Sequence, residues 1–555
     1  MGKQHLTSLL PYFKEGITMQ EIIESIAKSL YSDDCPQKEH SRIYKIHKYW
    51  ARKPWYIVEK YIAQYSNTGD TIMDPFCGSG CTGLEAVING RNFKGQDLNP
   101  MALLVSKGTL LNNIDWTSFN QDVEMITTKC REKILRLYQS EHTCKHCNNQ
   151  MYFKYVNIGP KFEKPSGGVY CCKCKSKTIK RDLTESEIEA MHKQNELFIE
   201  NWVPDTLFPK KFYKDRFSYK GISAVKDMYT TRNLYALSIL YSAIQNSSES
   251  NRELLTLAFT NTVLHASKLK GENVRPLGVN NYWIPDDYIE ENVWFRFEDR
   301  LKNVIKAKQQ QDKRIKDKKK LGIDYGNWSL EKKSALEYMG NECIDYFFTD
   351  PPYGDAIQYS ELSFVWNAWL QTEYETKEEI IINPVQNKSA KEFEHLLSKS
   401  LDNIYTALKP NGYLTLCFQN KNSAIWKAVI THCKQIGFKL YDISIYDTYG
   451  SPFNKSWANF SPKSDIYVTF KKSQYDVAST YSANETVPDI IREVATYFEA
   501  HDIDYDNNKL YDFVISYLIW AMYLNDREIN VKDFTIKKFS ELANDILSNS
   551  IENNF

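Results

Sequence analysis

The sequence has no excess of charge of either sign. Its 555 residues include 70 Lys and Arg and 70 Asp and Glu. Net charge therefore neither indicates nor excludes a polyanionic partner, and only local basic clusters can mark a nucleic-acid surface. With 42% hydrophobic and 14% aromatic residues, the composition excludes a largely disordered chain. A single core does not fill this length, so we expect about three or four structural units.

Long apolar runs are also absent. The longest, Phe513–Leu524, falls well short of the ~20 residues that a membrane-spanning helix needs, and it predicts a buried helix instead. Residues 1–30 are amphipathic and lack the apolar core and cleavage site of a signal peptide. We therefore expect a cytoplasmic bacterial protein that does not contact membranes and whose 12 cysteines are reduced.

Four of these cysteines form two Cys-x-x-Cys pairs, at 144–147 and 171–174. Four thiolates at this spacing can close a tetrahedral zinc site, in which metal binding contributes folding energy. The pattern predicts a structural zinc ribbon with the ligands Cys144, Cys147, Cys171 and Cys174. Cys172 is spare, and His142 or His146 could replace a ligand. A redox-active pair is the alternative, but two neighbouring pairs fit a metal better.

A glycine-rich turn follows the first predicted strand. The apolar stretch 71–73 leads into Asp74-Pro-Phe-Cys-Gly-Ser-Gly80, then into a helix and a second strand that ends at Asp97. Glycine lets a ligand approach the backbone closely, and a helix N-terminus offers free N–H groups. The separation of Gly78 and Asp97 matches the ~20 residues between a glycine turn and a ribose-binding carboxylate in dinucleotide-type folds. This order predicts a nucleoside cofactor site.

A second motif, Thr349-Asp-Pro-Pro-Tyr353, closes the apolar strand predicted at 343–348. An exocyclic base amine is a poor nucleophile because its lone pair is delocalised into the ring. A carboxylate such as Asp350 and a backbone carbonyl such as that of Pro351 can each accept one N–H, which leaves the lone pair free to attack. The prolines fix the backbone, and the Tyr353 ring can stack on a flipped base. Positioning and pre-set dipoles then supply most of the rate.

Strands and helices alternate in both parts of the chain. After the second motif, a helix at 401–412 leads to a strand at 413–418, and a helix at 424–436 precedes a strand at 465–470. This alternation predicts an α/β fold with a doubly wound, mainly parallel sheet and an inserted zinc ribbon and helical regions. Ligands are expected at the carboxyl ends of strands in such a sheet. That expectation favours a binding site at 349–353 over the alternative of a plain turn.

On this basis the chain divides into six segments. The first and last are expected to be helical and receive no function. The segments are an N-terminal helical segment 1–40, the cofactor-binding half of the sheet domain 41–115, a zinc-ribbon insertion 116–200, a helical and aromatic insertion 201–325, the catalytic half 326–475, and a C-terminal helical tail 476–555.

Two basic stretches in the second insertion are candidates for target recognition, because they lie between the two halves of the site. One suits phosphate contacts and base stacking, since basic and aromatic residues are interleaved. Its residues are Phe208, Lys210, Lys211, Phe212, Tyr213, Lys214 and Arg216. The other, 300–320, predicts a Lys-dense helix broken at Gln309-Gln-Gln. A solvated face is the alternative for each stretch.

Both motifs resemble the cofactor and catalytic motifs of bacterial DNA amino-methyltransferases. The segments His47–Pro54, Gly69–Phe76 and Tyr359–Leu362 are similar to the subgroup of adenine-specific DNA methylases that carry a zinc ribbon. The resemblance covers roughly residues 40–470 and departs at Cys81, where many relatives carry Thr. It implies a Rossmann-like methyltransferase fold with S-adenosylmethionine as cofactor and a structural zinc.

The resemblance also implies residue roles. Phe76, Gly78 and Gly80 would surround the cofactor, and Asp97 would bind its ribose. The implied cofactor-binding set is Lys53, Pro54, Asp74, Pro75, Phe76, Gly78, Gly80 and Asp97. The implied catalytic set, which holds the target base, is Asp350, Pro351, Pro352 and Tyr353.

The implied function is methyl transfer to N6 of a flipped adenine at a specific site in double-stranded DNA, in restriction–modification or phage defence. A restriction endonuclease or defence-system subunits would be partners, although we identify no nuclease motif in this sequence. Three alternatives stay open: N4-cytosine methylation of DNA, N6-adenine methylation of RNA, and a non-catalytic zinc-ribbon subunit that binds DNA. Asp rather than Ser at position 350 favours adenine, and the intact Asp74, Asp97 and Asp350 argue against the non-catalytic subunit.

Overall fold

The computed structural model describes residues 18–28, 42–160, 165–171, 173–175, 177–213, 221–271, 276, 282–447, 464–473, 486–524 and 535–552. Its largest sheet has seven strands in the order β11-β12-β10-β9-β1-β2-β8. These strands are β1 (Thr71–Asp74), β2 (Asn92–Asp97), β8 (Trp328–Lys332), β9 (Ile344–Thr349), β10 (Leu408–Phe418), β11 (Phe438–Asp447) and β12 (Ser464–Lys472). The predicted α/β fold with a mainly parallel sheet is confirmed.

The sheet is mixed rather than purely parallel. The five strands from β8 to β10 pair in parallel, whereas β12 runs antiparallel between β10 and β11. β11 is a strand that the sequence predictions omit. The connections from β1 and β9 lead to opposite sides of the sheet, so the carboxyl ends of this central pair flank the switch point, where open α/β sheets bind ligands.

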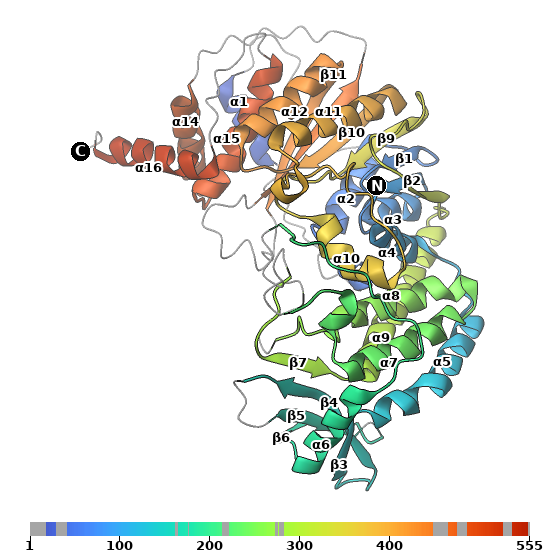
Figure 1. The fold of residues 1–555 in the computed structure, drawn as a ribbon. Helices are drawn as coiled ribbons and strands as arrows, with labels where there is room; N and C mark the ends of the chain where they lie inside the picture. Colours follow the sequence, from blue (N-terminus) through green and yellow to red (C-terminus); the bar gives the residue numbers. More distant parts are fainter. Residues whose placement is uncertain are drawn as a thin grey trace.

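Helices cover both faces of this sheet (Figure 1). Side chains alternate along a strand, so Ile72 and Phe348 pack in one layer while Met73 and Phe347 pack in the other. The first layer contains α2 (Trp55–Tyr65) and α3 (Cys81–Ile88), next to α4 (Pro100–Leu110). The second contains α1 (Met19–Lys28), α11 (Ala390–Ala407), α12 (Ser423–Gln435), α14 (Val487–Ala500), α15 (Asn507–Leu524) and α16 (Ile536–Glu552).

The predicted apolar helix near the C-terminus is α15, and it is buried against the sheet. Leu510, Val514 and Tyr517 on it are inaccessible to solvent. Within the described ranges, no helix has the length and apolar character needed to cross a bilayer.

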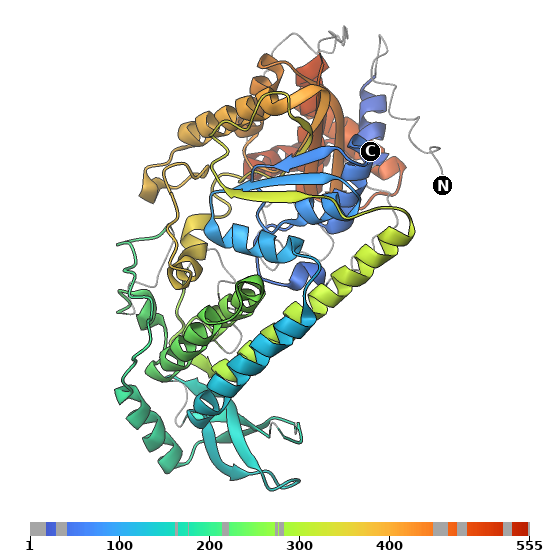
Figure 2. The ribbon, with the colours of Figure 1, turned by 90° about the vertical axis from the view of Figure 1, so that its right-hand side faces the viewer.

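The chain between β2 and β8 forms an elongated insertion. α5 (Trp116–Arg136) leads away from the sheet and α9 (Val293–Lys320) returns beside it (Figure 2). At the far end lies an antiparallel sheet of β3 (Gln139–Thr143), β4 (Gln150–Ile158), β5 (Ser166–Tyr170), β6 (Ile179–Asp182) and β7 (Tyr288–Glu291). The insertion also contains α6 (Glu185–Lys193), α7 (Thr231–Gln245) and α8 (Glu249–His265), and α7 and α8 pack against α5 and α9. The predicted break at Gln309–Gln311 is wrong: α9 is continuous there, and Gln311 is itself buried, with its Nε2 donating to the Leu111 carbonyl (3.2 Å).

The insertion shares a core with the segment that follows the second motif. α10 (Tyr359–Trp369) buries two indole rings in that core: Trp366 Nε1 donates to the carbonyl of Thr260 (2.9 Å), and Trp369 Nε1 donates to the Tyr229 hydroxyl (3.0 Å). A buried ion pair between Arg314 and Glu85 joins α9 to α3. These contacts fix the insertion relative to the main sheet.

Candidate active site

The glycine turn after β1 is held by the Asp74 carboxylate. Asp74 is 3% exposed and accepts hydrogen bonds from the hydroxyls of Thr349 (2.8 Å) and Thr82 (2.9 Å) and from the Phe76 N–H (3.1 Å). It therefore joins β1, β9 and α3. Burial raises its pKa to about 6, although these hydrogen bonds oppose the shift.

Two glycines allow this turn to close. Gly78 and Gly80 have φ angles of +51° and +75°, a region that side-chain-bearing residues rarely occupy. A Cβ atom at Gly80 would lie 2.9 Å from Ser106 Cα of α4, which is too close for another residue. The predicted turn is therefore present. Gly80 allows the turn to pack closely against α4 and does not line the pocket.

Asp97 ends β2 beside this turn. Its Oδ2 accepts from the Gly78 N–H (2.9 Å) and its Oδ1 from the Asn99 N–H (2.9 Å). Burial raises its pKa to about 6, while both backbone donors favour the ionised form. The glycine turn and the end of the second strand are thus brought together, as the spacing in the sequence predicts.

The second motif begins at the end of β9, next to β1. The Tyr353 hydroxyl donates to Asp350 Oδ1 (2.6 Å), and Lys53 Nζ donates to the same hydroxyl (2.6 Å). Lys53 Nζ also lies 3.5 Å from Asp350 Oδ1 and 3.4 Å from Asp465 Oδ2, which belongs to β12. Lys53 and Asp465 thus complete a buried polar cluster around Asp350.

This cluster sets the charge states. Burial raises the pKa of Asp350 to about 7, and the Lys53 ammonium opposes that rise. Burial on its own lowers the pKa of Lys53, but Asp350 and Asp465 outweigh it and hold that pKa well above its ordinary value. Lys53 therefore stays protonated, while Asp350 changes charge near neutrality.

The Tyr353 ring is turned into the protein. Its edge meets Phe418 (5.5 Å between centroids), and Lys53 Nζ lies 5.0 Å from its centroid. Its backbone carbonyl accepts from Asn420 Nδ2 (3.1 Å), which braces the loop. Because Lys53 Nζ lies 2.6 Å from the Tyr353 hydroxyl, it sits at the hydroxyl end of the ring rather than over its face, and it holds the ring in position.

Both motifs line one pocket, which opens to solvent. Eight of the predicted site residues line it, namely Lys53, Asp74, Pro75, Phe76, Gly78, Asp97, Asp350 and Pro352. Pro54, Gly80, Pro351 and Tyr353 lie outside the lining: Pro54 and Gly80 are the residues that precede α2 and α3, and the other two are adjacent to Pro352. The pocket sits at the carboxyl ends of β1 and β9.

The sequence predictions missed several residues of this pocket. Tyr49 and Arg52 lie within the motif His47–Pro54, which could have identified them. Arg52 Nε donates to Ser79 Oγ (3.2 Å) in the glycine turn, and its Nη2 donates to the His47 carbonyl (2.8 Å). Glu379 comes from a loop with no such signal.

Glu379 contributes a buried carboxylate with spare acceptor capacity. It is 3% exposed, and its Oε1 accepts from the Ser360 N–H (2.9 Å). Its Oε2 has no hydrogen-bond partner among the described residues. Burial raises its pKa to about 7, and hydrogen bonds from Ser360 oppose the shift.

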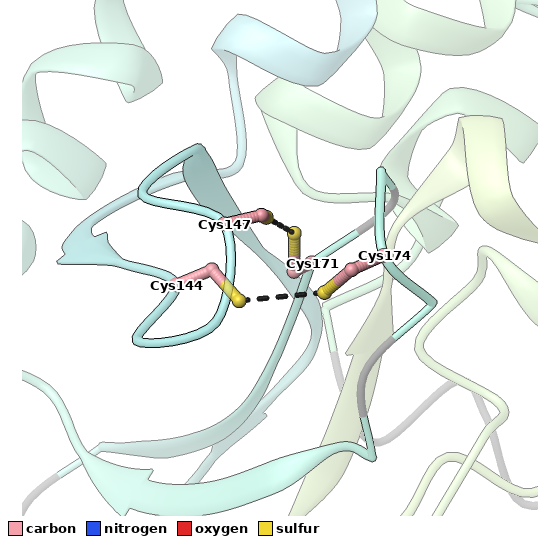
Figure 3. A group of neighbouring side chains, drawn as sticks. All are labelled: Cys144, Cys147, Cys171 and Cys174. Atoms are coloured by element: carbon pink, nitrogen blue, oxygen red, sulfur yellow. Dashed lines mark hydrogen bonds between the residues drawn. The ribbon is translucent and has the colours of Figure 1, made fainter.

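The four predicted metal ligands form a separate cluster in the insertion (Figure 3). Cys144 and Cys147 lie between β3 and β4, and Cys171 and Cys174 follow β5. Their sulfur atoms all lie within 4.8 Å of one another, with 3.4 Å between Cys144 and Cys174 and 3.5 Å between Cys147 and Cys171. Tetrahedral zinc with Zn–S bonds near 2.3 Å needs sulfur atoms about 3.8 Å apart. The cluster fits such an ion. Cys172 lies outside the described residues.

Two of the aromatic residues expected to stack on bases, Phe208 and Phe212, pack inside the protein instead. Phe212 is buried and packs with Phe208, Tyr282 and Phe364. Lys210 and Lys211 are exposed, and Lys214 and Arg216 lie outside the described residues. The Phe208 and Phe212 rings form part of the insertion's core.

The family model described as DNA methylase (N6/N4 methyltransferase) matches residues 21–107 and 344–553, more than half of the chain. The chain belongs to this DNA methylase family. Both motifs, Lys53, Glu379 and Asp465 fall within the matched ranges. The insertion with its four cysteines falls outside them, so it is an addition to the part shared with the DNA methylases.

Two curated relatives match shorter stretches. The Type II methyltransferase M.MthZI of Methanothermobacter thermautotrophicus is 31% identical over 137 residues, 21% of this chain and 39% of that protein. The Type II methyltransferase M2.DpnII of Streptococcus pneumoniae is 40% identical over 63 residues, 11% of this chain and 24% of that protein. The chain thus matches well under half the length of these relatives.

Two solved structures also align with the chain, each at 12% identity. TTHA0409 of Thermus thermophilus gives a TM-score of 0.15 over 27% of this chain and 52% of that chain. PH0851 gives a TM-score of 0.16 over 67% of this chain and 68% of that chain. Scores this low support no conclusion about the fold.

Proposed function

We propose that this member of the DNA methylase family transfers a methyl group from S-adenosylmethionine to the N6 amine of an adenine flipped out of double-stranded DNA. One observation carries the proposal: the glycine turn and Asp350 line the same pocket, at the switch point of the sheet. A cofactor held by the first motif would face a base held by the second. Such juxtaposition is what group transfer requires.

The chemistry of the pocket fits the cofactor. S-adenosylmethionine presents ribose hydroxyls, an ammonium group and a sulfonium, so it needs acceptors and negative charge. Asp97 would accept from the ribose hydroxyls, and the unpartnered Glu379 Oε2 offers a further buried acceptor. Phe76 and Gly78 would line the nucleoside. When bound, the cofactor supplies an electrophilic methyl group.

The second motif would prepare the attacking nitrogen. The Asp350 carboxylate and the Pro351 carbonyl would each accept one N–H of the base amine, which leaves the lone pair directed at the methyl group. The C–N bond forms as the C–S bond breaks, and the methylated amine then loses a proton to Asp350 or to water. Tyr353 would stack on the base, with its hydroxyl held by Lys53 Nζ.

Lys53 is assigned here to the catalytic side of the pocket. It lies against Asp350 and Tyr353 rather than beside the glycine turn. Because its charge favours ionised Asp350, Lys53 would keep that carboxylate able to accept an N–H at neutral pH. Asp465 would hold Lys53 in this position.

The four cysteines would hold a structural zinc that stabilises the insertion, which is consistent with the zinc-ribbon subgroup of adenine-specific methylases. The insertion, at 116–325, is the proposed target-recognition region. A restriction endonuclease or defence-system subunit would be the partner of such an enzyme, and the proposed location is the cytoplasm of a bacterium.

The proposal is tested by incubating the purified chain with isotopically labelled S-adenosylmethionine and genomic DNA. Mass spectrometry of the digested nucleosides then identifies the product. N6-methyladenine is expected. Detection of N4-methylcytosine would instead identify cytosine as the target base. Label found in RNA but not in duplex DNA would identify RNA as the substrate. Failure to bind the cofactor, measured by calorimetry, would favour a non-catalytic subunit. Sequencing of modified bases in a host that expresses the chain would reveal the recognised site.

A further inference from the structure

A basic groove lies beside the candidate active site. It is a solvent-open hollow whose lining contains six fixed positive charges, two histidines, two asparagines and Tyr49, with no acidic residue among the described residues that line it. The positive charges are Arg42, Lys45, Lys48, Arg52, Arg300 and Lys306. The whole chain has equal numbers of acidic and basic residues, so this grouping is a local departure from its composition.

The groove is assembled from segments far apart in the sequence. Arg42 precedes the 3₁₀ turn η2 (Ile43–Lys45) and Lys45 is its last residue. Residues three apart in such a turn project in the same direction, so these two side chains lie on one side. Arg300, Asn303 and Lys306 recur every three residues along one side of α9. His47 Nε2 lies 3.0 Å from Thr260 Oγ1, and Asn261 Nδ2 donates to the Ile46 carbonyl (3.0 Å), so η2 is tied to α8.

Several of these charges are not neutralised locally. Arg42, Lys45 and Lys306 are exposed and form no ion pair with a described acid, whereas Arg300 pairs with its neighbour Asp299. A polyanion would therefore gain favourable contacts that the folded chain itself does not supply.

The groove is continuous with the pocket that holds the two motifs. Tyr49 and Arg52 line both. Arg52 spans the boundary, since it bonds the glycine turn at Ser79 and the groove wall at His47. The helix rises about 9 Å from Arg300 to Lys306. Side chains this far apart can contact different phosphates along one strand.

We propose that this groove binds the phosphate backbone of DNA beside the flipped base. The proposal rests on the proposed function, which supplies the duplex and places the base in the adjoining pocket. Phosphate contacts of this kind fix the position of a duplex without reading its sequence. The groove would therefore place the target strand at the mouth of the pocket, while recognition of the site occurs elsewhere on the insertion.

The test compares two double variants of the full chain. Lys45→Gln with Lys306→Gln removes two groove charges. Lys316→Gln with Lys319→Gln removes two exposed charges of α9 that point away from the groove, since 3.6 residues per turn place them on the opposite side. The probe is a fluorescein-labelled duplex oligonucleotide of mixed sequence, titrated by anisotropy over a range of salt concentrations.

The groove variant should bind the duplex more weakly than wild type, and the slope of log K against log salt should fall by roughly 2, about 0.9 for each lost contact. The control variant should keep the wild-type slope. Calorimetric affinity for S-adenosylmethionine should be unchanged in both, which shows that the variants fold. Wild-type duplex affinity and slope in the groove variant would overturn the proposal.

The partner class and the proposed function are tested separately. Groove-dependent binding that is tighter to RNA of the same sequence than to the duplex would overturn the assignment to DNA. If the wild-type chain fails to bind S-adenosylmethionine, the proposed function falls, while the duplex titration still decides the role of the groove.

Discussion

The Lys53 ammonium lies 3.5 Å from the Asp350 carboxylate, and both groups are largely buried. Lys53 precedes α2, whereas Asp350 follows β9, so folding alone brings the two together. A buried charge that loses its partner is strongly disfavoured. The pair therefore ties the protonation of Asp350 to a residue outside the second motif.

Replacement of Asp350 should separate chemistry from cofactor binding. Asp350→Ala removes one of the two acceptors for the base amine, and methyl transfer should fall by roughly a hundredfold or more. Affinity for S-adenosylmethionine should change little, because Asp97 and the glycine turn are intact. Single-turnover transfer and calorimetry measure the two effects. Asp402→Ala, at an exposed carboxylate of α11, is the control. Parallel loss of transfer and of cofactor affinity would contradict this division of roles.

The rate of methyl transfer should increase with pH through about 7, where Asp350 ionises and becomes a full acceptor. Lys53 lowers the pKa of Asp350, so Lys53→Met should move the midpoint to higher pH. Single-turnover rates across the pH range measure this shift. Lys60→Met, on the exposed side of α2, should leave the midpoint in place. A midpoint that stays or falls in the Lys53 variant would show that the ion pair does not set the charge of Asp350.

Cofactor binding should release protons. S-adenosylmethionine has a net positive charge, which favours ionised carboxylates and should lower the pKa values of Asp97, about 6, and Glu379, about 7. Affinity should therefore rise as the pH increases across this interval. Calorimetry in buffers of different ionisation enthalpy counts the released protons. Glu379→Gln should reduce that count at pH 7, whereas Glu375→Gln, at an exposed position, should not. Equal counts would remove Glu379 from the cofactor site.

Loss of one cysteine should empty the metal cluster. Cys144→Ser should abolish bound zinc and lower the thermal stability of the insertion, because Cys144 and Cys171 are part of its buried core. Metal analysis and thermal unfolding test this outcome, and a strong chelator should act on wild type in the same direction. Cys343→Ser, at a thiol outside the cluster, is the control. Unchanged zinc content in the Cys144 variant would count against the site.

The proximity of the two motifs in the fold could be predicted from the sequence, because each motif lies at the end of a strand. The carboxyl ends of neighbouring parallel strands meet at one edge of a sheet, so Asp74, Asp97 and Asp350 were bound to converge once the strands were recognised. The cysteine cluster was predictable for a similar reason, since its spacing is local within each pair.

Other parts of the site depend on tertiary contacts that leave no local pattern. Asp465 and Glu379 are single acidic residues, and only the folded chain places them beside Lys53 and in the pocket. Phe212 fits a base-stacking pattern, yet burial against Tyr282 is the stronger demand on an aromatic ring. The basic groove joins η2 to α9, so no single stretch contains it.

The two indole rings of α10 join the insertion to the candidate active-site domain. Trp366 and Trp369 belong to α10, the first helix after the second motif, yet their hydrogen-bond acceptors are Thr260 and Tyr229 of the insertion. Excising the insertion would leave both rings facing water. If the insertion reads the target site as proposed, new specificity would have to arise from side-chain changes on this scaffold rather than from exchange of the whole insertion.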